Sequence, residues 1–192
     1  MKRVDILSTP IWSIDFEEGE KYKEEILPLL LEYEVKFPMN IDYSLNGYTS
    51  YSREVTNILQ FDELSFLKNF VIDHARVASK EIGIEGEPYI TDSWFSINRK
   101  GSYHGMHNHN PDIWSGIYYV QAKEDDAKIC FYDLNKASNW PWGPVDSSMS
   151  AMKSFLPKTG RLYLFPSYIM HEVEQQVNDS DRISISFNLG VR

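Results

Sequence analysis

Two histidines separated by one residue, in the segment GMHNHNPD at 105–112, are the first side chains that could do chemistry. Side chains two positions apart on a strand point to the same face, so His107 and His109 could direct both imidazoles at one metal ion. The only later histidine, His171, begins another strand-like run and could supply a third nitrogen. Three histidines leave coordination positions open, which suits a catalytic first-row metal better than a closed structural one. The pair alone is weak support, because an exposed turn also tolerates histidines.

The segment RISISFNLG at 182–190 strengthens the case, because polar and apolar residues alternate along it. One face carries Arg182, Ser184, Ser186 and Asn188, and the other carries Ile183, Ile185, Phe187 and Leu189. If the apolar face packs beneath a helical layer, the polar face lines an interior where an arginine needs a partner. A buried anionic ligand would be that partner, since Arg182 can bind a carboxylate through two hydrogen bonds and Ser184 can donate a third. The alternative is a solvated outer face on which Arg182 pairs with a surface carboxylate.

The elements that must position these residues begin with two helices in the first half of the chain. The pattern over 22–33 predicts a helix that either starts again or is kinked at Pro28. Apolar residues recur every three or four positions over 62–82 and predict a longer amphipathic helix. Asp62 is a suitable N-cap for this second helix, and Gly83 a suitable stop.

From Pro88 onward, short β-rich runs alternate with turn residues and predict an antiparallel barrel or sandwich. The runs are YITDSWFSIN, WSGIYYVQA, AKICFYDL, RLYLFPS, HEVEQQV and RISISFNLGV. We therefore expect a mainly β fold with flanking helices. The expected organisation is one domain over 1–192, with helical support in 1–87 and the β core in 88–192.

Composition and charge limit the classes of function. The chain has 28 acidic and 19 basic side chains and a formal net charge of -9, so nucleic acids and anionic membranes are disfavoured as partners. No run approaches the roughly 18 apolar residues that span a bilayer. Asp5 interrupts the apolar stretch near the start, so we do not expect a secretory signal there. The single cysteine, Cys130, rules out an intramolecular disulfide. We expect a cytoplasmic protein with a free, buried thiol.

The chain resembles the iron(II)- and 2-oxoglutarate-dependent oxygenases, and among them a bacterial and phage group of 2OG-Fe(II) oxygenases. The resemblance covers nearly the whole chain and runs through STPIW, WFSINRKGSYHGMHNHN, WSGIYYV, PKTGRLYLFPSYIMHEV and DRISISFN. It implies a double-stranded β-helix, or jelly-roll, core. In the wider superfamily, His-x-Asp or His-x-Glu and a distal histidine hold the metal, and an arginine after that histidine, often followed by a serine, binds 2-oxoglutarate. His107, His171, Arg182 and Ser184 match that pattern in order and spacing.

Position 109 departs from the pattern, because His109 stands where the wider superfamily has a carboxylate. An imidazole there leaves the centre with the full charge of the metal ion, whereas a carboxylate would reduce it by one. Three possibilities stay open at this point. The metal is held by three histidines, or Asp112 turns inward after Pro111 and replaces one of them, or there is no functional metal.

Further residues are assigned to the cosubstrate by resemblance alone. Related enzymes often use a tyrosine or an asparagine from the early strands, which points to Asn98, Tyr103 and one residue of the pair Tyr118 and Tyr119. Alternation places one tyrosine of that pair inward without saying which, and we assign Tyr119 with Asn98. His104 is expected beside the site or on the surface.

The resemblance implies a dioxygenase that uses Fe(II) and 2-oxoglutarate to hydroxylate a small-molecule or peptidyl substrate, with release of succinate and CO2. The long segment 133–154, which contains Trp140 and Trp142, is either a substrate lid or a loop that wraps the barrel. One alternative function is a cupin-like three-histidine dioxygenase or isomerase, for which Arg182 and Ser184 have no evident use. The other is a non-catalytic ligand-binding barrel, which the missing carboxylate favours.

Overall fold

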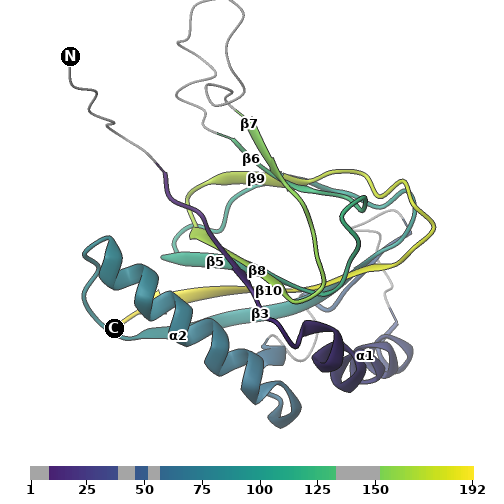
Figure 1. The fold of residues 1–192 in the computed structure, drawn as a ribbon, viewed down its shortest axis with the longest axis horizontal. Helices are drawn as coiled ribbons and strands as arrows, with labels where there is room; N and C mark the ends of the chain where they lie inside the picture. Colours follow the sequence, from purple (N-terminus) through teal and green to yellow (C-terminus); the bar gives the residue numbers. More distant parts are fainter. Residues whose placement is uncertain (1–8, 39–45, 52–56, 133–151) are drawn as a thin grey trace, which may run out of the picture.

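A computed structural model describes residues 9–38, 46–51, 57–132 and 152–192 (Figure 1). Two helices and ten strands follow one another along these residues. In chain order they are β1 (Trp12–Asp15), α1 (Gly19–Lys36), β2 (Tyr48–Thr49), α2 (Ser65–Glu81), β3 (Pro88–Asn98), β4 (His104–His107), β5 (Trp114–Gln121), β6 (Ile129–Tyr132), β7 (Met152–Phe155), β8 (Arg161–Pro166), β9 (Met170–Val173) and β10 (Arg182–Val191). Each of the six β-rich runs predicted from the sequence contains a strand, although HEVEQQV extends beyond the end of β9. The short strands β1, β2, β4 and β7 were not predicted.

The strands form two antiparallel sheets that face each other (Figure 1). The larger sheet has the order β1-β8-β5-β10-β3-β2, and the smaller has the order β4-β9-β6-β7. Strand β10 lies inside the larger sheet, paired with β3 on one side and β5 on the other. The strand pattern predicted an antiparallel barrel or sandwich with flanking helices, and the fold is the double-stranded β-helix that the resemblance implied.

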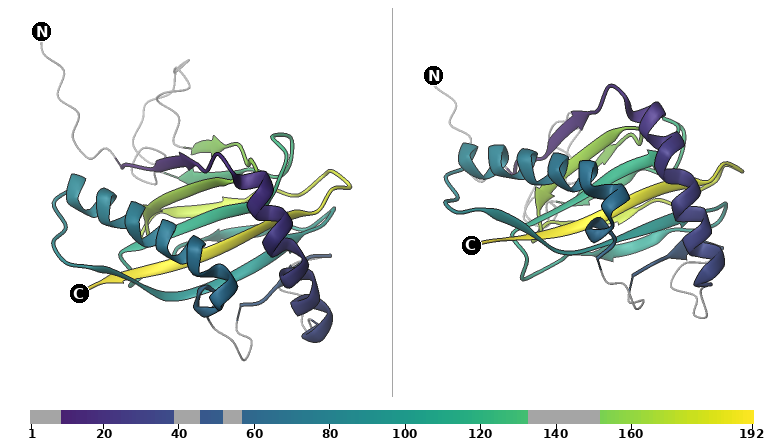
Figure 2. Two further views of the ribbon diagram at one scale, coloured as in Figure 1. Left: turned by 60° about the horizontal axis from the view of Figure 1, so that its bottom comes forward. Right: turned by 90° about the horizontal axis from the view of Figure 1, so that it is seen from below.

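Both helices cover the outer face of the larger sheet (Figure 2). Their buried side chains join the apolar residues of β10 in one core: Tyr22, Ile26, Leu30 and Tyr33 from α1, Leu67, Val71, Ala75 and Ala78 from α2, and Ile183, Ile185, Phe187 and Leu189 from β10. Burial of this apolar face is the main driving force for docking the helices. It also fixes the direction of the opposite, polar face of β10, which must point between the two sheets.

The helices differ in detail from the prediction. Helix α1 runs through Pro28 without restarting. Asp62 belongs to a short 3₁₀ turn, Asp62–Leu64, and the N-cap of α2 is Leu64, which makes no side-chain capping bond. The prediction of Asp62 as N-cap is therefore wrong, because a separate turn precedes the helix. Gly83 follows the end of α2 with φ of +79°, a left-handed conformation that favours glycine and ends a helix, as expected.

Three further expectations concern the cysteine, membrane-spanning helices and the segment 133–154. Cys130 is a free, buried thiol, as predicted. Among the described helices, none is long and apolar enough to cross a membrane. Most of the segment 133–154, including Trp140 and Trp142, lies outside the described residues, so the lid hypothesis stays a prediction.

Candidate metal centre

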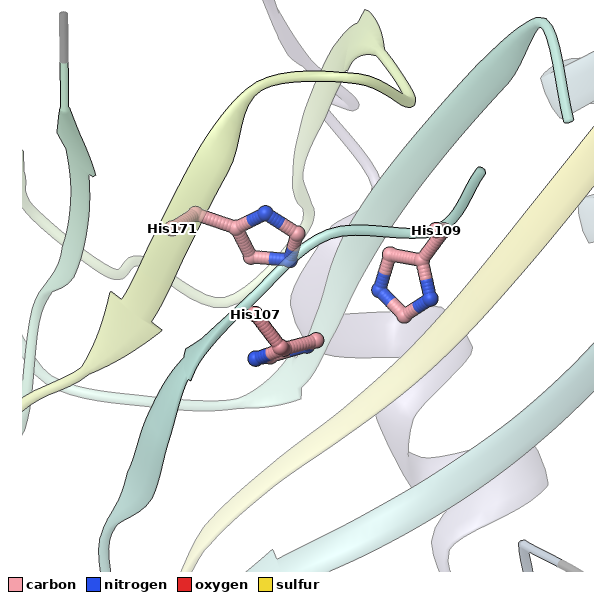
Figure 3. Close-up of side chains that lie close together, drawn as sticks. All are labelled: His107, His109 and His171. Atoms are coloured by element: carbon pink, nitrogen blue, oxygen red, sulfur yellow. The ribbon is translucent and has the colours of Figure 1, made fainter. Parts of the chain in front are cut away.

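The three histidines singled out from the sequence come together between the sheets. The candidate ligand atoms of His107, His109 and His171 all lie within 4.8 Å of one another. Figure 3 shows the three imidazoles turned toward a common space. In the part of the chain that the structure describes, this is the one group of three or more His, Cys, Asp or Glu side chains close enough to share a metal ion.

Two different structural features, strand pairing and a turn, position these rings. His107 and His171 are Cα partners across β4 and β9, so sheet pairing brings them side by side. His109 lies beyond the end of β4, and its backbone N–H donates to the carbonyl oxygen of Ser167 at 3.0 Å. The prediction that the three histidines converge is correct, but the predicted cause for His109, alternation along a strand, is wrong. A turn tied to the end of β8, not alternation along a strand, directs its ring.

Backbone carbonyl groups orient two of the imidazoles. The Nδ1 atom of His107 lies 2.7 Å from the carbonyl oxygen of Gly105, and the Nδ1 atom of His171 lies 2.9 Å from that of Ile169. A carbonyl oxygen only accepts hydrogen bonds, so each Nδ1 must carry the proton. Each Nε2 then has a free lone pair, which is the form that binds a metal.

The environment keeps these imidazoles neutral. Burial, together with the neighbouring histidines, lowers the pKa of His109 to about 4 and the pKa of His171 to about 3. Burial also lowers the pKa of His107. Desolvation disfavours the imidazolium form in each case. At neutral pH the rings are therefore unprotonated at one nitrogen and ready to coordinate a cation.

Asp112 does not join the cluster. Its Oδ1 atom accepts a hydrogen bond of 2.8 Å from the hydroxyl of Thr91, on β3. His104 does lie beside the cluster, with its ring stacked on His107 at a centroid separation of 4.1 Å. Of the donor sets left open by the sequence, the geometry brings together three histidines and leaves Asp112 out.

Arg182 is the second unusual feature of this interior. Its side chain is 1% exposed, and the predicted alternative of a solvated outer face is therefore wrong. Its Nη1 atom donates to Asn98 Oδ1 at 2.9 Å and its Nη2 atom donates to the Tyr119 hydroxyl at 3.3 Å. Its Nε atom is buried without a hydrogen-bond partner, and no carboxylate of the described residues forms an ion pair with the guanidinium. Such an arginine is costly unless a ligand completes it.

One cavity of about 330 Å³ joins Arg182 to the histidines. The residues singled out from the sequence that line it are Asn98, Tyr103, His104, His107, His109, His171, Arg182, Ser184 and Ser186. Tyr119 packs on the inner side, where Arg182 lies 4.8 Å from its ring centroid. Tyr118 belongs to the core beneath the helices, which answers the question that alternation left open. The candidate metal ligands and the buried arginine therefore face the same cavity.

Sequence and fold comparisons identify the family. Residues 92–188, a little over half of the chain, match the model of the family described as "Putative 2OG-Fe(II) oxygenase". The chain belongs to this family of 2OG-Fe(II) oxygenases. No curated sequence is significantly similar to the oxygenase.

Solved structures share its fold at low identity. HygX from Streptomyces hygroscopicus, bound to nickel and 2-oxoglutarate, superposes with a TM-score of 0.63 at 12% identity, over 95% of this chain and 83% of HygX. A Pseudomonas putida prolyl-4-hydroxylase superposes with a TM-score of 0.63 at 14% identity, over 96% of this chain and 94% of the hydroxylase. A Trichoplax adhaerens prolyl hydroxylase superposes with a TM-score of 0.64 at 14% identity, over 94% of this chain and 83% of the hydroxylase. At these identities, the likeness is one of fold.

An aromatic wall of the cavity was missed in the sequence. Trp94 lies on β3 with its ring centroid 5.6 Å from that of His109 and 5.0 Å from that of Tyr51, and both aromatic residues line the cavity. The available signal was alternation, because Trp94 shares a face of β3 with Ser96 and Asn98. For Tyr51 there was none, since the chain reaches the cavity there outside any predicted element.

Proposed function

We propose that this oxygenase binds Fe(II) through His107, His109 and His171 and 2-oxoglutarate through Arg182, and that it hydroxylates a small-molecule or peptidyl substrate. The observation that carries the proposal is the buried guanidinium of Arg182, which has an unpaired Nε and faces the same cavity as three neutral imidazoles. A dicarboxylate that bridges a metal ion and an arginine satisfies both requirements at once.

The donor set fits a labile divalent ion. Three imidazole nitrogens suit Fe(II) and its neighbours in the first transition row, and they leave positions for exogenous ligands. The carbonyl oxygens of Gly105 and Ile169 hold two of the rings in the required tautomer, so little reorganisation accompanies binding. His109 replaces the carboxylate of the wider superfamily without closing the site.

The far end of the cavity fits a carboxylate. Asn98 and Tyr119 each hold one terminal nitrogen of Arg182, and this fixes the plane of the guanidinium. Burial raises the pKa of Tyr119, so its hydroxyl stays neutral. Ser184 lies two residues along β10 and lines the cavity on the same side. We assign the distal carboxylate of 2-oxoglutarate to Arg182 and Ser184, with Asn98 and Tyr119 as positioning residues.

When bound, Fe(II) and 2-oxoglutarate would supply oxygen activation coupled to decarboxylation of the cosubstrate to succinate and CO2. The residues of the chain bind and orient these groups and exclude water. Ile117, Ile129 and Phe165 supply apolar walls of the cavity, which strengthen the electrostatic contacts made by Arg182.

The choice of substrate class draws on the similar folds. HygX has been crystallised with hygromycin B bound, and the Trichoplax prolyl hydroxylase with a peptide fragment of hypoxia inducible factor. The fold thus accommodates a small molecule in one protein and a peptide in another. We propose hydroxylation of a compound from one of these two classes.

The test is consumption of 2-oxoglutarate by purified protein with Fe(II), ascorbate and oxygen. We expect formation of succinate in the absence of added substrate, at a rate that depends on both iron and 2-oxoglutarate. Iron binding without any binding or turnover of 2-oxoglutarate would support a cupin-like enzyme instead. Binding of neither iron nor 2-oxoglutarate would leave a ligand-binding barrel and would refute the proposal.

A further inference from the structure

The charges around the cavity are unbalanced. Arg182 is the one charged side chain among the described residues that line it, and no aspartate or glutamate lies in that lining. The lining also holds His104, His107, His109 and His171, and an imidazole that coordinates a metal ion is neutral. The described walls of the cavity therefore carry the positive charge of Arg182 and no negative charge.

The bound groups do not cancel this charge. A divalent ion adds two positive charges, and 2-oxoglutarate contributes two negative ones. One positive charge remains, because His109 is neutral where a carboxylate would have supplied the last negative charge. An uncompensated charge removed from water is costly, so an anionic group in the remaining space would be favoured.

A free hydrogen-bond donor lies where such a group could bind. The pairing of β4 with β9 shifts register between His104 and His107, so these residues, three apart, both line the cavity. Regular alternation would place them on opposite faces, and β-bulges commonly re-aim a side chain at a functional site. His104 is exposed, and its ring stacks on His107 and makes no hydrogen bond to the other described residues. Its N–H is therefore free to donate to a ligand.

We propose that the substrate of this oxygenase carries a monoanionic group, such as a carboxylate, which lies in the cavity facing His104 and the metal centre. The inference rests on the proposed three-histidine site and the binding of 2-oxoglutarate. The net charge of -9 does not oppose it. Charges outside the cavity are screened over about 8 to 10 Å by physiological salt, whereas those that line it act on the substrate across a short distance.

The test compares matched pairs of small compounds that differ in charge, benzoate with benzamide and butyrate with butyramide. Each is titrated into protein loaded with Ni(II) and 2-oxoglutarate, in chloride-free buffer, and binding is measured by ligand-observed NMR. Nickel replaces iron to prevent turnover. We expect each carboxylate to bind at least about tenfold more tightly than its amide, as for a charge-assisted hydrogen bond.

Two variants should remove this preference. His109→Asp restores the missing negative charge, and His104→Phe keeps a ring to stack on His107 but removes the donor. The matched control is His74→Asp, which makes the same change of charge on α2. The ring of His74 contacts Phe70 and does not line the cavity. This variant should keep the preference of the wild-type protein.

Several outcomes would overturn the inference. They are equal affinity for the two members of each pair, failure of all four compounds to bind, or an unchanged preference in both cavity variants. Loss of the preference on adding chloride would assign the position to a free inorganic anion and not to the substrate. Binding of Ni(II) and of 2-oxoglutarate is measured first, so that failure of the proposed function is recognised separately.

Discussion

His107 and His171 are direct Cα partners across β4 and β9, and their ring centroids lie 4.3 Å apart. The two strands occupy neighbouring positions in the smaller sheet, and His171 is only 4% exposed. Sheet register therefore fixes the separation of these two candidate ligands before any metal binds. Such a pair is preorganised, and its loss should affect metal binding more than folding.

His107→Ala and His171→Ala should each abolish stoichiometric iron binding and leave the protein folded. Two nitrogen ligands are too few to hold a labile divalent ion, whereas neither imidazole supports the core beneath the helices. The measurements are iron content after anaerobic reconstitution and circular dichroism. His74→Ala is a control that should keep iron. If either cavity variant retains a full equivalent of iron, that residue does not belong to the site.

His109→Asp should retain iron, because it restores the donor set of the wider superfamily at the same position. Asp112→Ala should also retain it, since the carboxylate of Asp112 accepts a hydrogen bond from Thr91 and lies outside the cluster. Iron titrations of the two folded variants check this pair of expectations. Loss of iron from Asp112→Ala alone would show that Asp112 moves inward when the metal binds.

The pattern of β10 was the most informative part of the sequence. Strict alternation between polar and apolar residues predicted both its burial and the direction of Arg182, because one face had to pack beneath the helices. The short strands could not be predicted in the same way. Strand β4 covers only His104–His107, and its pairing with β9 depends on residues more than sixty positions away. Local periodicity carries no information about such contacts.

The site was predictable in its residue types but not in its geometry. The His-x-His pair, the one later histidine and the alternation along β10 pointed to His107, His171 and Arg182, whereas the choice between His109 and Asp112 depended on a turn held by the carbonyl oxygen of Ser167. Alternation likewise left Tyr118 and Tyr119 equivalent, and only the tertiary structure shows which hydroxyl reaches Arg182. These choices are made by long-range contacts, which a single sequence does not display.

Asp126 should stabilise the loops that lead into β10. Its carboxylate accepts hydrogen bonds from the Gln176 side chain at 2.7 Å, the Ser180 hydroxyl at 2.8 Å and the backbone N–H of Lys123 at 2.8 Å. Asp126→Ala leaves these donors unpaired and should lower the free energy of unfolding by about 1 to 3 kcal/mol. Urea denaturation at neutral pH measures the difference. A change within error of zero would mean that water replaces the carboxylate.

The same residue predicts a pH dependence. Burial acts to raise the pKa of Asp126, but the hydrogen bonds to Lys123, Gln176, Ser180 and Asn178 outweigh it, and the pKa lies below its ordinary 3.8. A carboxyl group whose pKa is lowered by folding stabilises the protein above its unfolded pKa and loses that contribution as the pH falls through the folded value. The difference in the free energy of unfolding between wild type and Asp126→Asn should therefore become smaller below pH 3.8. A difference independent of pH would contradict this assignment.

Replacement of Arg182 should weaken 2-oxoglutarate binding without affecting the metal. Lysine keeps the charge but loses the planar pair of donors, and methionine loses both, so affinity should fall in the order Arg, Lys, Met. A hydrogen bond to a charged group is worth about 1.5 to 3 kcal/mol, which corresponds to a loss of roughly ten- to a hundredfold for each bond removed. Iron affinity should hardly change, because the guanidinium donates its hydrogen bonds to Asn98 and Tyr119 and cannot ligate a cation.

Anaerobic titration of 2-oxoglutarate into the iron-loaded variants, followed by calorimetry or by the metal-to-ligand absorption band, measures this series. Arg76→Met is a matched control, because Arg76 pairs with Asp73 and Glu87 away from the cavity, and its loss should leave the affinity unchanged. If wild type and Arg182→Met bind 2-oxoglutarate with equal affinity, Arg182 does not bind the cosubstrate. The buried, unpaired Nε of Arg182 would then need a different anionic partner, and the preference for a 2-oxoglutarate-dependent reaction over a cupin-like one would lose its main structural support.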